Sequence, residues 1–181
     1  GAEKMKRFYA WTWLCCLAVT SPLTFAKEIQ GMSFSHQDWE VYCSNTGTCR
    51  AAGYQDDHLQ SMPATILLTR KAGAKQTVQG TFALSSFDQA LDNKKLNSLN
   101  FFINHQDYGR VRINISEQLL TGSLNSKQLN ALLQQTRKKV NIVFKNAYYT
   151  WQVSDAGMTA SLLKMDDFQQ RMGTVGALVK P

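Results

Sequence analysis

The sequence of 181 residues lacks the short motifs that mark common enzyme classes. It has no C-x-x-C redox pair, no H-E-x-x-H zinc helix, no G-x-S-x-G nucleophile turn and no G-x-x-x-x-G-K phosphate loop. Its three histidines, His36, His58 and His105, lie far apart in the chain. We therefore predict no catalytic residue, no metal site and no cofactor.

Long apolar runs are also absent. A membrane-spanning helix needs about 20 consecutive apolar residues, and the longest apolar run, Phe8 to Val19, is shorter. Basic residues precede this run, and Thr24-Phe25-Ala26 provides small residues at a cleavage point before Lys27. This order of segments is typical of a secretory signal peptide.

The chain therefore divides into two parts. Residues 1–26 are predicted to be a tag or scar followed by the signal peptide, and residues 27–181 a single β-rich domain without a membrane span. Such a leader predicts export to the periplasm of a bacterium, or secretion. A domain of this length is large enough to bury a hydrophobic core.

Acidic residues are outnumbered. The chain has 20 Lys and Arg against 13 Asp and Glu, and removal of residues 1–26 takes Lys4, Lys6, Arg7 and Glu3, which leaves a net charge of +5. This charge is compatible with an anionic envelope component as partner, or simply with a solvated basic surface. Another periplasmic protein is the alternative partner, and nucleic-acid binding is not predicted.

Cysteine is scarce, because only Cys43 and Cys49 follow the signal peptide. Exported thiols meet an oxidising compartment and pair. Apolar and polar residues alternate on both sides of the pair, which predicts two strands joined by a loop at Asn45-Thr46-Gly47. Directly opposed residues of such a hairpin lie close enough for a disulfide, so we predict a structural disulfide rather than a redox couple or zinc ligands.

The remaining pattern predicts a mainly β, sandwich-like antiparallel fold with one or two short helices. About seven strands are expected. Beyond the hairpin, they are predicted at 64–70, 76–84, 108–115, 140–144, 148–153 and 174–179, and residues 85–107 are predicted to be a long excursion with a short buried segment at 99–103. One helix is expected to begin after a cap at Asn125 or Ser126 and to carry Arg137-Lys138-Lys139 in its last turn. The segment 158–168 is predicted to be a shorter helix or an irregular turn.

Three groups of residues are candidates for ligand binding. Arg110 and Arg112 should share the wet face of the strand 108–115, where spaced guanidinium groups can engage phosphates or carboxylates. Tyr148 and Trp151 can belong to an aromatic platform or to the core. Asp56, Asp57 and His58 form either an acid–base or cation-binding cluster or an exposed polar loop.

Two stretches resemble a known family. "DWEVYCSNTGTCRAAGY" (38–54) is similar to the W-x-V-x-C-D-N-T-x-T-C signature of an uncharacterised family of exported bacterial proteins with a domain of unknown function. "GMTASLLKMDDFQQRMGTVGALVKP" (157–181) resembles the end of that family's N-terminal half. Ser44 and Gln170 depart from the pattern, which has aspartate and glycine there. The tryptophan-then-cysteine strand is also distantly similar to invasion-associated locus B proteins, which are exported β-sandwiches.

The resemblance implies no activity. Our first hypothesis is an exported, non-catalytic binding or interaction module of the cell envelope. The alternatives are a hydrolase acting on envelope or cell-wall material, with acids among Asp56, Asp57, Asp166 and Asp167, and a periplasmic inhibitor or immunity protein.

Overall fold

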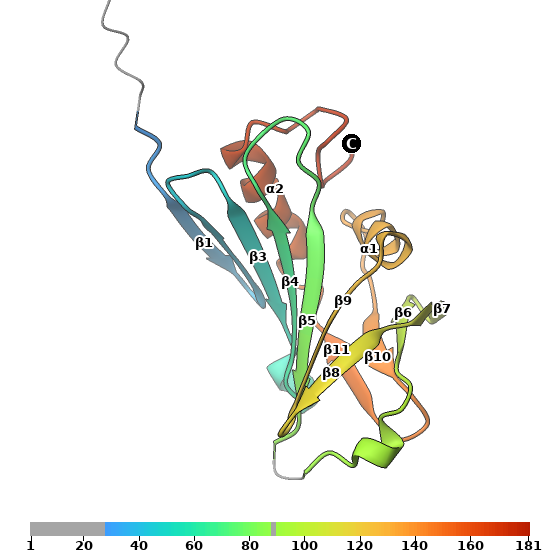
Figure 1. Cartoon of the computed structure of the whole chain (residues 1–181). Helices are drawn as coiled ribbons and strands as arrows, with labels where there is room; N and C mark the ends of the chain where they lie inside the picture. The colour runs from blue at the N-terminus through green and yellow to red at the C-terminus, as the bar shows by residue number, and fades with distance from the viewer. Residues whose placement is uncertain (1–27, 88–89) are drawn as a thin grey trace, which may run out of the picture.

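A computed structural model describes residues 28–87 and 90–181, so the predicted signal peptide lies outside the described residues. Its strands pair antiparallel in two sheets (Figure 1). The seven-stranded sheet has the order β1 (Met32–His36), β2 (Trp39–Cys43), β3 (Cys49–Tyr54), β4 (Ala64–Arg70), β5 (Gln79–Ser85), β9 (Leu119–Ser123) and β8 (Arg112–Ser116). The four-stranded sheet has the order β11 (Thr150–Val153), β10 (Ile142–Lys145), β6 (Asn100–Ile103) and β7 (Gln106–Arg110).

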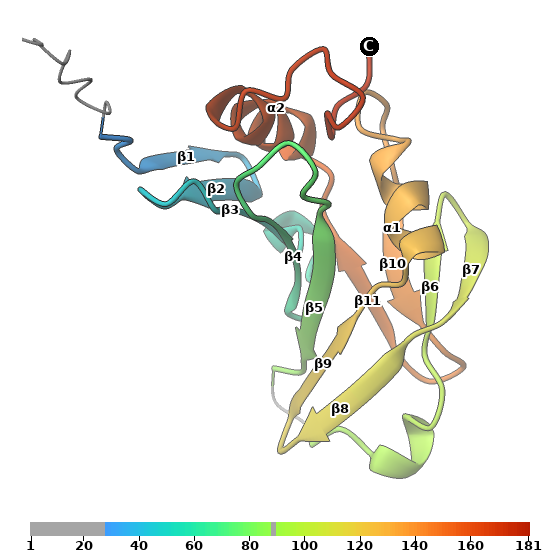
Figure 2. The ribbon, with the colours of Figure 1, turned by 45° about the horizontal axis from the view of Figure 1, so that its top comes forward.

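Two α-helices complete the domain, α1 (Ser126–Leu133) and α2 (Met158–Phe168), together with single 3-10 turns at Asp57–Leu59 and Asn93–Lys95. Helix α2 packs on β1, β2 and β3, and α1 contacts β6 and β7. Figures 1 and 2 place α2 and the four-stranded sheet on the same side of the seven-stranded sheet. The predicted mainly β antiparallel fold with two short helices is therefore confirmed.

Alternating burial along the strands builds the core between the layers. In β2, Trp39 and Val41 are buried while Glu40 and Tyr42 are exposed, as the sequence alternation predicts. The Trp39 Nε1 donates a 2.7 Å hydrogen bond to the carbonyl oxygen of Ser154. Across from Trp39 stands Gly53, where a Cβ atom would lie 2.2 Å from the indole, so only glycine fits there.

The two sheets meet through aromatic side chains. Phe82 of β5 lies 4.6 Å from Phe144 of β10, measured between ring centroids, and Phe144 contacts Phe101 of β6 at 5.0 Å. Trp151 of β11 is fully buried, and its Nε1 donates to the carbonyl oxygen of Ser85 on β5. These aromatic contacts hold the second sheet against the first.

Two of the predicted strands, 108–115 and 174–179, are wrong. The segment 108–115 is interrupted at buried Val111, where the chain leaves the four-stranded sheet and enters the seven-stranded one. The segment 174–179 forms turns instead of a strand. Its Leu178 and Val179 N–H groups donate to the carboxylate of Asp166 on α2, so they do not join a sheet.

The basic run 137–139 also lies elsewhere than predicted. Helix α1 begins after Asn125, which forms a capping box with Gln128, but the helix ends at Leu133. Arg137 follows in a turn, where its Nε donates to the carbonyl oxygen of Lys180. The prediction that this run complements the C-terminal dipole of the helix is therefore wrong, because the chain leaves the helix one turn earlier.

Candidate binding site

The hairpin between β2 and β3 holds the predicted disulfide. Cys43 and Cys49 are directly opposed, with Cα atoms 4.0 Å apart, and their sulfur atoms are bonded. The Ser44 N–H donates to the Thr48 carbonyl oxygen, and Gly47 adopts φ +86°, the left-handed conformation expected at the end of this loop. Both cysteines are fully buried, so the pair is a structural disulfide that links the two strands of the hairpin.

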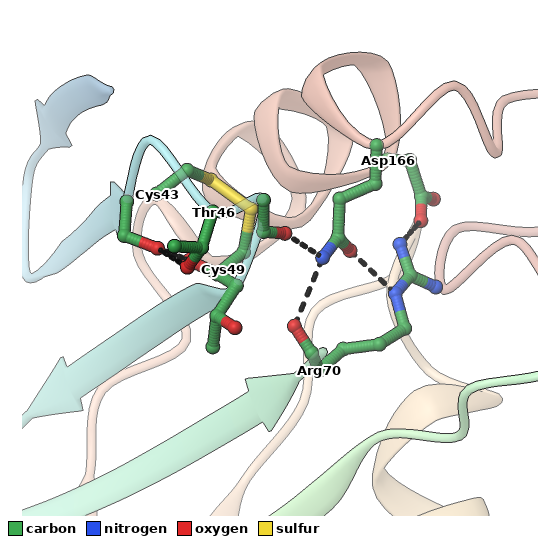
Figure 3. The surroundings of a disulfide bond; sticks show 9 residues. Cys43, Thr46, Cys49, Arg70 and Asp166 are labelled. Carbon is green, nitrogen blue, oxygen red and sulfur yellow. Dashed lines mark hydrogen bonds and ion pairs between the residues drawn. A yellow bond between two sulfur atoms is a disulfide. The ribbon is translucent and has the colours of Figure 1, made fainter. Parts of the chain in front are cut away.

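Beside this hairpin, Arg70 and Asp166 form a buried ion pair (Figure 3). Their Nη2 and Oδ1 atoms are 2.7 Å apart, and Gln169 links Arg70 to the hairpin by accepting from Arg70 Nε and donating to the Gly47 carbonyl oxygen. Burial lowers the pKa of Arg70, and the hydrogen bond and charge of Asp166 act in the opposite direction. The Asp166 carboxylate is thus committed to holding β4, α2 and the C-terminal segment together.

The acids named for a hydrolase do not converge. Asp56 caps the 3-10 turn that precedes β4 by accepting from the His58 N–H, whereas Asp166 bonds Arg70 at the far end of that strand. Seven residues of strand separate these two ends by about 20 Å. Asp57 and His58 are exposed, as the polar-loop interpretation expects, and Asp167 is exposed on α2.

The two aromatic candidates differ in their exposure to solvent. Tyr148 is exposed in the turn between β10 and β11, and Lys95 lies over its ring at 5.5 Å from the centroid. Trp151 belongs to the core and has no exposed surface, so its assignment as a ligand-contacting residue is wrong. Strand alternation turns Trp151 inward against β4 and β5, which is the core interpretation of the sequence pattern.

The two arginines, by contrast, meet at one cavity. Arg110 ends β7 and Arg112 begins β8, and both line a hollow of about 510 Å³ that we call the arginine pocket. Its other lining residues lie in β8, β9 and α1 or in the short links beside them. They are Val111, Asn114, Gly122, Ser123, Leu124, Asn125 and Gln128. The two side chains therefore share a cavity although their strands belong to different sheets.

Backbone contacts hold both arginines in place. Buried Gln128 donates from Nε2 to the carbonyl oxygen of Arg110 at 3.2 Å, while its Oε1 accepts from the Asn125 N–H. The Val111 N–H donates to the Leu99 carbonyl oxygen. The backbone of Arg112 stands opposite Ser123 where β8 pairs with β9. The cap of α1 thus positions the crossing between the sheets that carries both guanidinium groups.

The charged side chains that line the pocket are all basic. None of its lining residues is Asp or Glu, and within the described part of the chain neither guanidinium has an ion-pair or hydrogen-bond partner. Both arginines are exposed. Unpaired guanidinium groups favour a ligand that carries phosphate or carboxylate.

Comparison with known proteins identifies the family. Residues 33–181, from β1 to the C-terminal segment, match the family described as protein of unknown function (DUF1176). The chain belongs to this family. No curated protein matches the chain. The resemblance to a family with a domain of unknown function is thereby confirmed.

One solved structure is similar to this DUF1176 chain. The crystal structure of invasion associated protein b from Bartonella henselae matches 77% of this chain and 99% of its own chain, with 12% sequence identity and a TM-score of 0.46.

Sequence reasoning identified the arginines of the pocket but missed the residues that surround them. Gln128 carried a detectable signal, since it stands three residues after Asn125 as a capping box requires. Asn114 and Ser123 carried none, because their place beside the arginines depends on the pairing of β8 with β9. Residues 28–87 and 90–181 contain no cluster of three potential metal ligands and no helix suited to crossing a membrane.

Proposed function

We propose that this DUF1176 domain is an exported, non-catalytic binding module that holds an anionic group of a bacterial envelope component in the arginine pocket. The observation that carries the proposal is the convergence of Arg110 and Arg112 on one cavity whose lining has no carboxylate. Each guanidinium can offer a pair of parallel hydrogen bonds to a phosphate or carboxylate. Two of them lining one cavity can hold such a group.

We favour binding over hydrolysis because the candidate catalytic acids either serve the fold or lie far apart. Asp166 accepts from Arg70, Leu178 and Val179, so its oxygens serve the fold. A glycoside hydrolase needs two carboxylates facing each other across a cleft, and Asp56 and Asp57 lie at the far end of β4 from Asp166. The arginine pocket is better suited to a role without bond cleavage.

Export to the periplasm is part of the proposal. It is supported by the leader pattern of residues 1–26 and by the disulfide, which forms in oxidising compartments. Osmotic-shock fractionation of cells that express the full chain tests it, with sequencing of the mature N-terminus. We expect the protein in the shock fluid with Lys27 as its first residue; an unprocessed chain in the cytoplasmic fraction would contradict export.

Binding of an anionic group can be tested on phosphocellulose. We expect Arg110→Gln/Arg112→Gln to elute at markedly lower salt than the wild type, because the guanidinium groups that hold phosphate are gone. The matched control is Lys138→Gln/Lys139→Gln, which removes the same charge from exposed positions outside the pocket. If both variants elute at equally lowered salt, retention depends on net charge alone and the proposed site is contradicted. Unchanged elution of the arginine variant would also overturn the proposed site.

A further inference from the structure

The arginine pocket adjoins further cavities on the outer face of the seven-stranded sheet. This is the face turned away from α2 and the second sheet (Figures 1 and 2). A central cavity of about 510 Å³ shares Asn114, Gly122 and Ser123 with the pocket. A third cavity of about 330 Å³ shares Ala52, Tyr54 and Leu67 with the central one and reaches Arg50. We call the three contiguous cavities the sheet groove.

The strand register explains the shape of the groove. Side chains on the outer face form rows that run straight across the strands. One row is Arg112, Ser123, Thr81, Leu67, Ala52 and Glu40, and the next is Asn114, Thr121, Ala83, Thr65 and Tyr54. Apart from Leu67, the side chains in the middle of both rows are small, and the long side chains of Arg112, Glu40 and Tyr54 stand at the row ends, so the floor is low between raised ends. Five strand spacings from β8 to β2 give it a length of about 24 Å.

The chemistry of the floor suits a ligand rich in hydroxyl groups. Thr65, Thr81 and Thr121 present hydroxyls that have no hydrogen-bond partner within the described part of the chain. Hydroxyls both donate and accept, as sugar hydroxyls do. Tyr54 and Tyr42 add aromatic surface at one end. Such a mixture of Tyr, Ser, Thr and Asn gives adaptable polar contacts together with rigid ring surface.

The direction of the groove argues against a peptide strand as occupant. It crosses strands whose backbone groups are already paired on both sides in β3, β4, β5 and β9. An extended peptide binds a sheet by adding to a free edge such as that of β8. A ligand in the groove meets side chains alone, which favours a chain recognised through hydroxyl and ring contacts.

Charge is concentrated at the two ends. Arg110 and Arg112 lie at the β8 end and Arg50 at the opposite end, while Glu40 accepts a hydrogen bond from the Tyr54 hydroxyl. From this arrangement we infer that the sheet groove binds an extended acidic polysaccharide, with its acidic groups at the arginines and its sugar rings over the threonine floor. This inference rests on the proposed function, since it uses the arginine pocket as one end of the site.

Calorimetric titration with oligogalacturonates of increasing length tests the occupant. We expect affinity to rise with each added residue until the oligomer spans the groove and then to level off. Neutral maltohexaose and hexaglutamate should each bind at least tenfold more weakly than hexagalacturonate. Monogalacturonate binding as tightly as the hexamer would overturn the extended site, and hexaglutamate of equal affinity would overturn the polysaccharide in favour of an acidic peptide.

A hydroxyl-deletion variant separates the groove from the arginine pocket. Thr81→Val/Thr121→Val keeps branched side chains on the strands and all arginines, but removes two free hydroxyls. We expect roughly tenfold weaker binding of hexagalacturonate, from the loss of two hydrogen bonds, and unchanged elution from phosphocellulose. The matched control Thr150→Val changes an exposed threonine of β11 on the other sheet and should leave both measurements at wild-type values.

A second variant tests the space above the floor. Ala83→Ile raises the centre of the groove with a side chain suited to strands, and should weaken the hexamer far more than the monomer. Wild-type hexamer affinity in both floor variants would overturn the groove, while arginine-dependent retention on phosphocellulose would still support the proposed function. Loss of that retention difference would instead overturn the proposed function itself.

Discussion

Arg70 at the end of β4 and Asp166 on α2 are joined by a 2.7 Å ion pair although 96 residues separate them in sequence. Both side chains are almost fully buried, at 2% and 1% exposure. The same carboxylate accepts from the N–H groups of Leu178 and Val179. This pair therefore connects the sheet, the helix and the C-terminal segment.

Removing one member of this pair should destabilise the domain strongly. Arg70→Met leaves the Asp166 carboxylate buried without its cation, which costs about 3–5 kcal/mol in comparable cases. Urea unfolding followed by circular dichroism measures the loss. Arg50→Met is the matched control, since Arg50 is exposed on the neighbouring strand, and should stay within about 0.5 kcal/mol of the wild type. Similar values for the two variants would contradict the structural role of the pair.

The disulfide should contribute a modest amount to stability. The Cys43–Cys49 bond closes a short loop, for which the chain-entropy account gives about 2 kcal/mol. We expect Cys43→Ala/Cys49→Ala to lose about that much in urea unfolding and to keep the same circular dichroism spectrum. Peptide mapping without reductant should recover the two cysteines in one linked peptide. Two free thiols in the mature protein would refute the structural disulfide.

Trp39 should be a major source of core stability. Its indole is 1% exposed and bonded to Ser154, so Trp39→Ala is expected to cost about 3–5 kcal/mol in the free energy of unfolding. Tyr42→Ala on the same strand is the control, because Tyr42 faces solvent and should change stability by only about 0.5 kcal/mol. A loss below about 1 kcal/mol for Trp39→Ala would place this residue outside the core.

Tyr54 should titrate at unusually high pH. Its hydroxyl donates to Glu40, and this hydrogen bond, followed by burial and the charge of Glu40, raises the pKa of Tyr54 from 10.0 to about 12. Because the folded pKa exceeds the unfolded one, the stabilisation is fully present below pH 10 and is lost as the pH rises towards 12. Ultraviolet difference titration measures the phenolate.

Glu40→Gln isolates the cause of that shift. Removal of the carboxylate should move the Tyr54 transition back towards the ordinary tyrosine value, while Glu117→Gln, which changes another exposed glutamate outside the sheet groove, should leave it in place. A Tyr54 transition that stays high in Glu40→Gln would assign the shift to burial alone.

Local pattern was sufficient wherever neighbouring residues in the chain decide the structure. The hairpin of β2 and β3, the strand β4 and the start of α1 follow from alternation, a left-handed glycine and a capping box, all of which act over a few residues. Strands β1 and β9 escaped prediction because they are short and largely polar. In β9 the signal is weakened further by Gly122, where a Cβ would collide with Phe82 and the Arg112 carbonyl oxygen.

The sequence by itself determined the antiparallel β character, the disulfide, the inward face of β2 and the exposure of Arg110 and Arg112, because each depends on short-range alternation and spacing. Only the tertiary structure decided that the chain changes sheets at Val111 and that the segment after α2 forms turns around Asp166. The meeting of the arginines with Gln128 and Asn114 was likewise decided there. These outcomes depend on which distant groups satisfy each buried backbone donor and fill each core space, and that pairing carries no local signature in the chain.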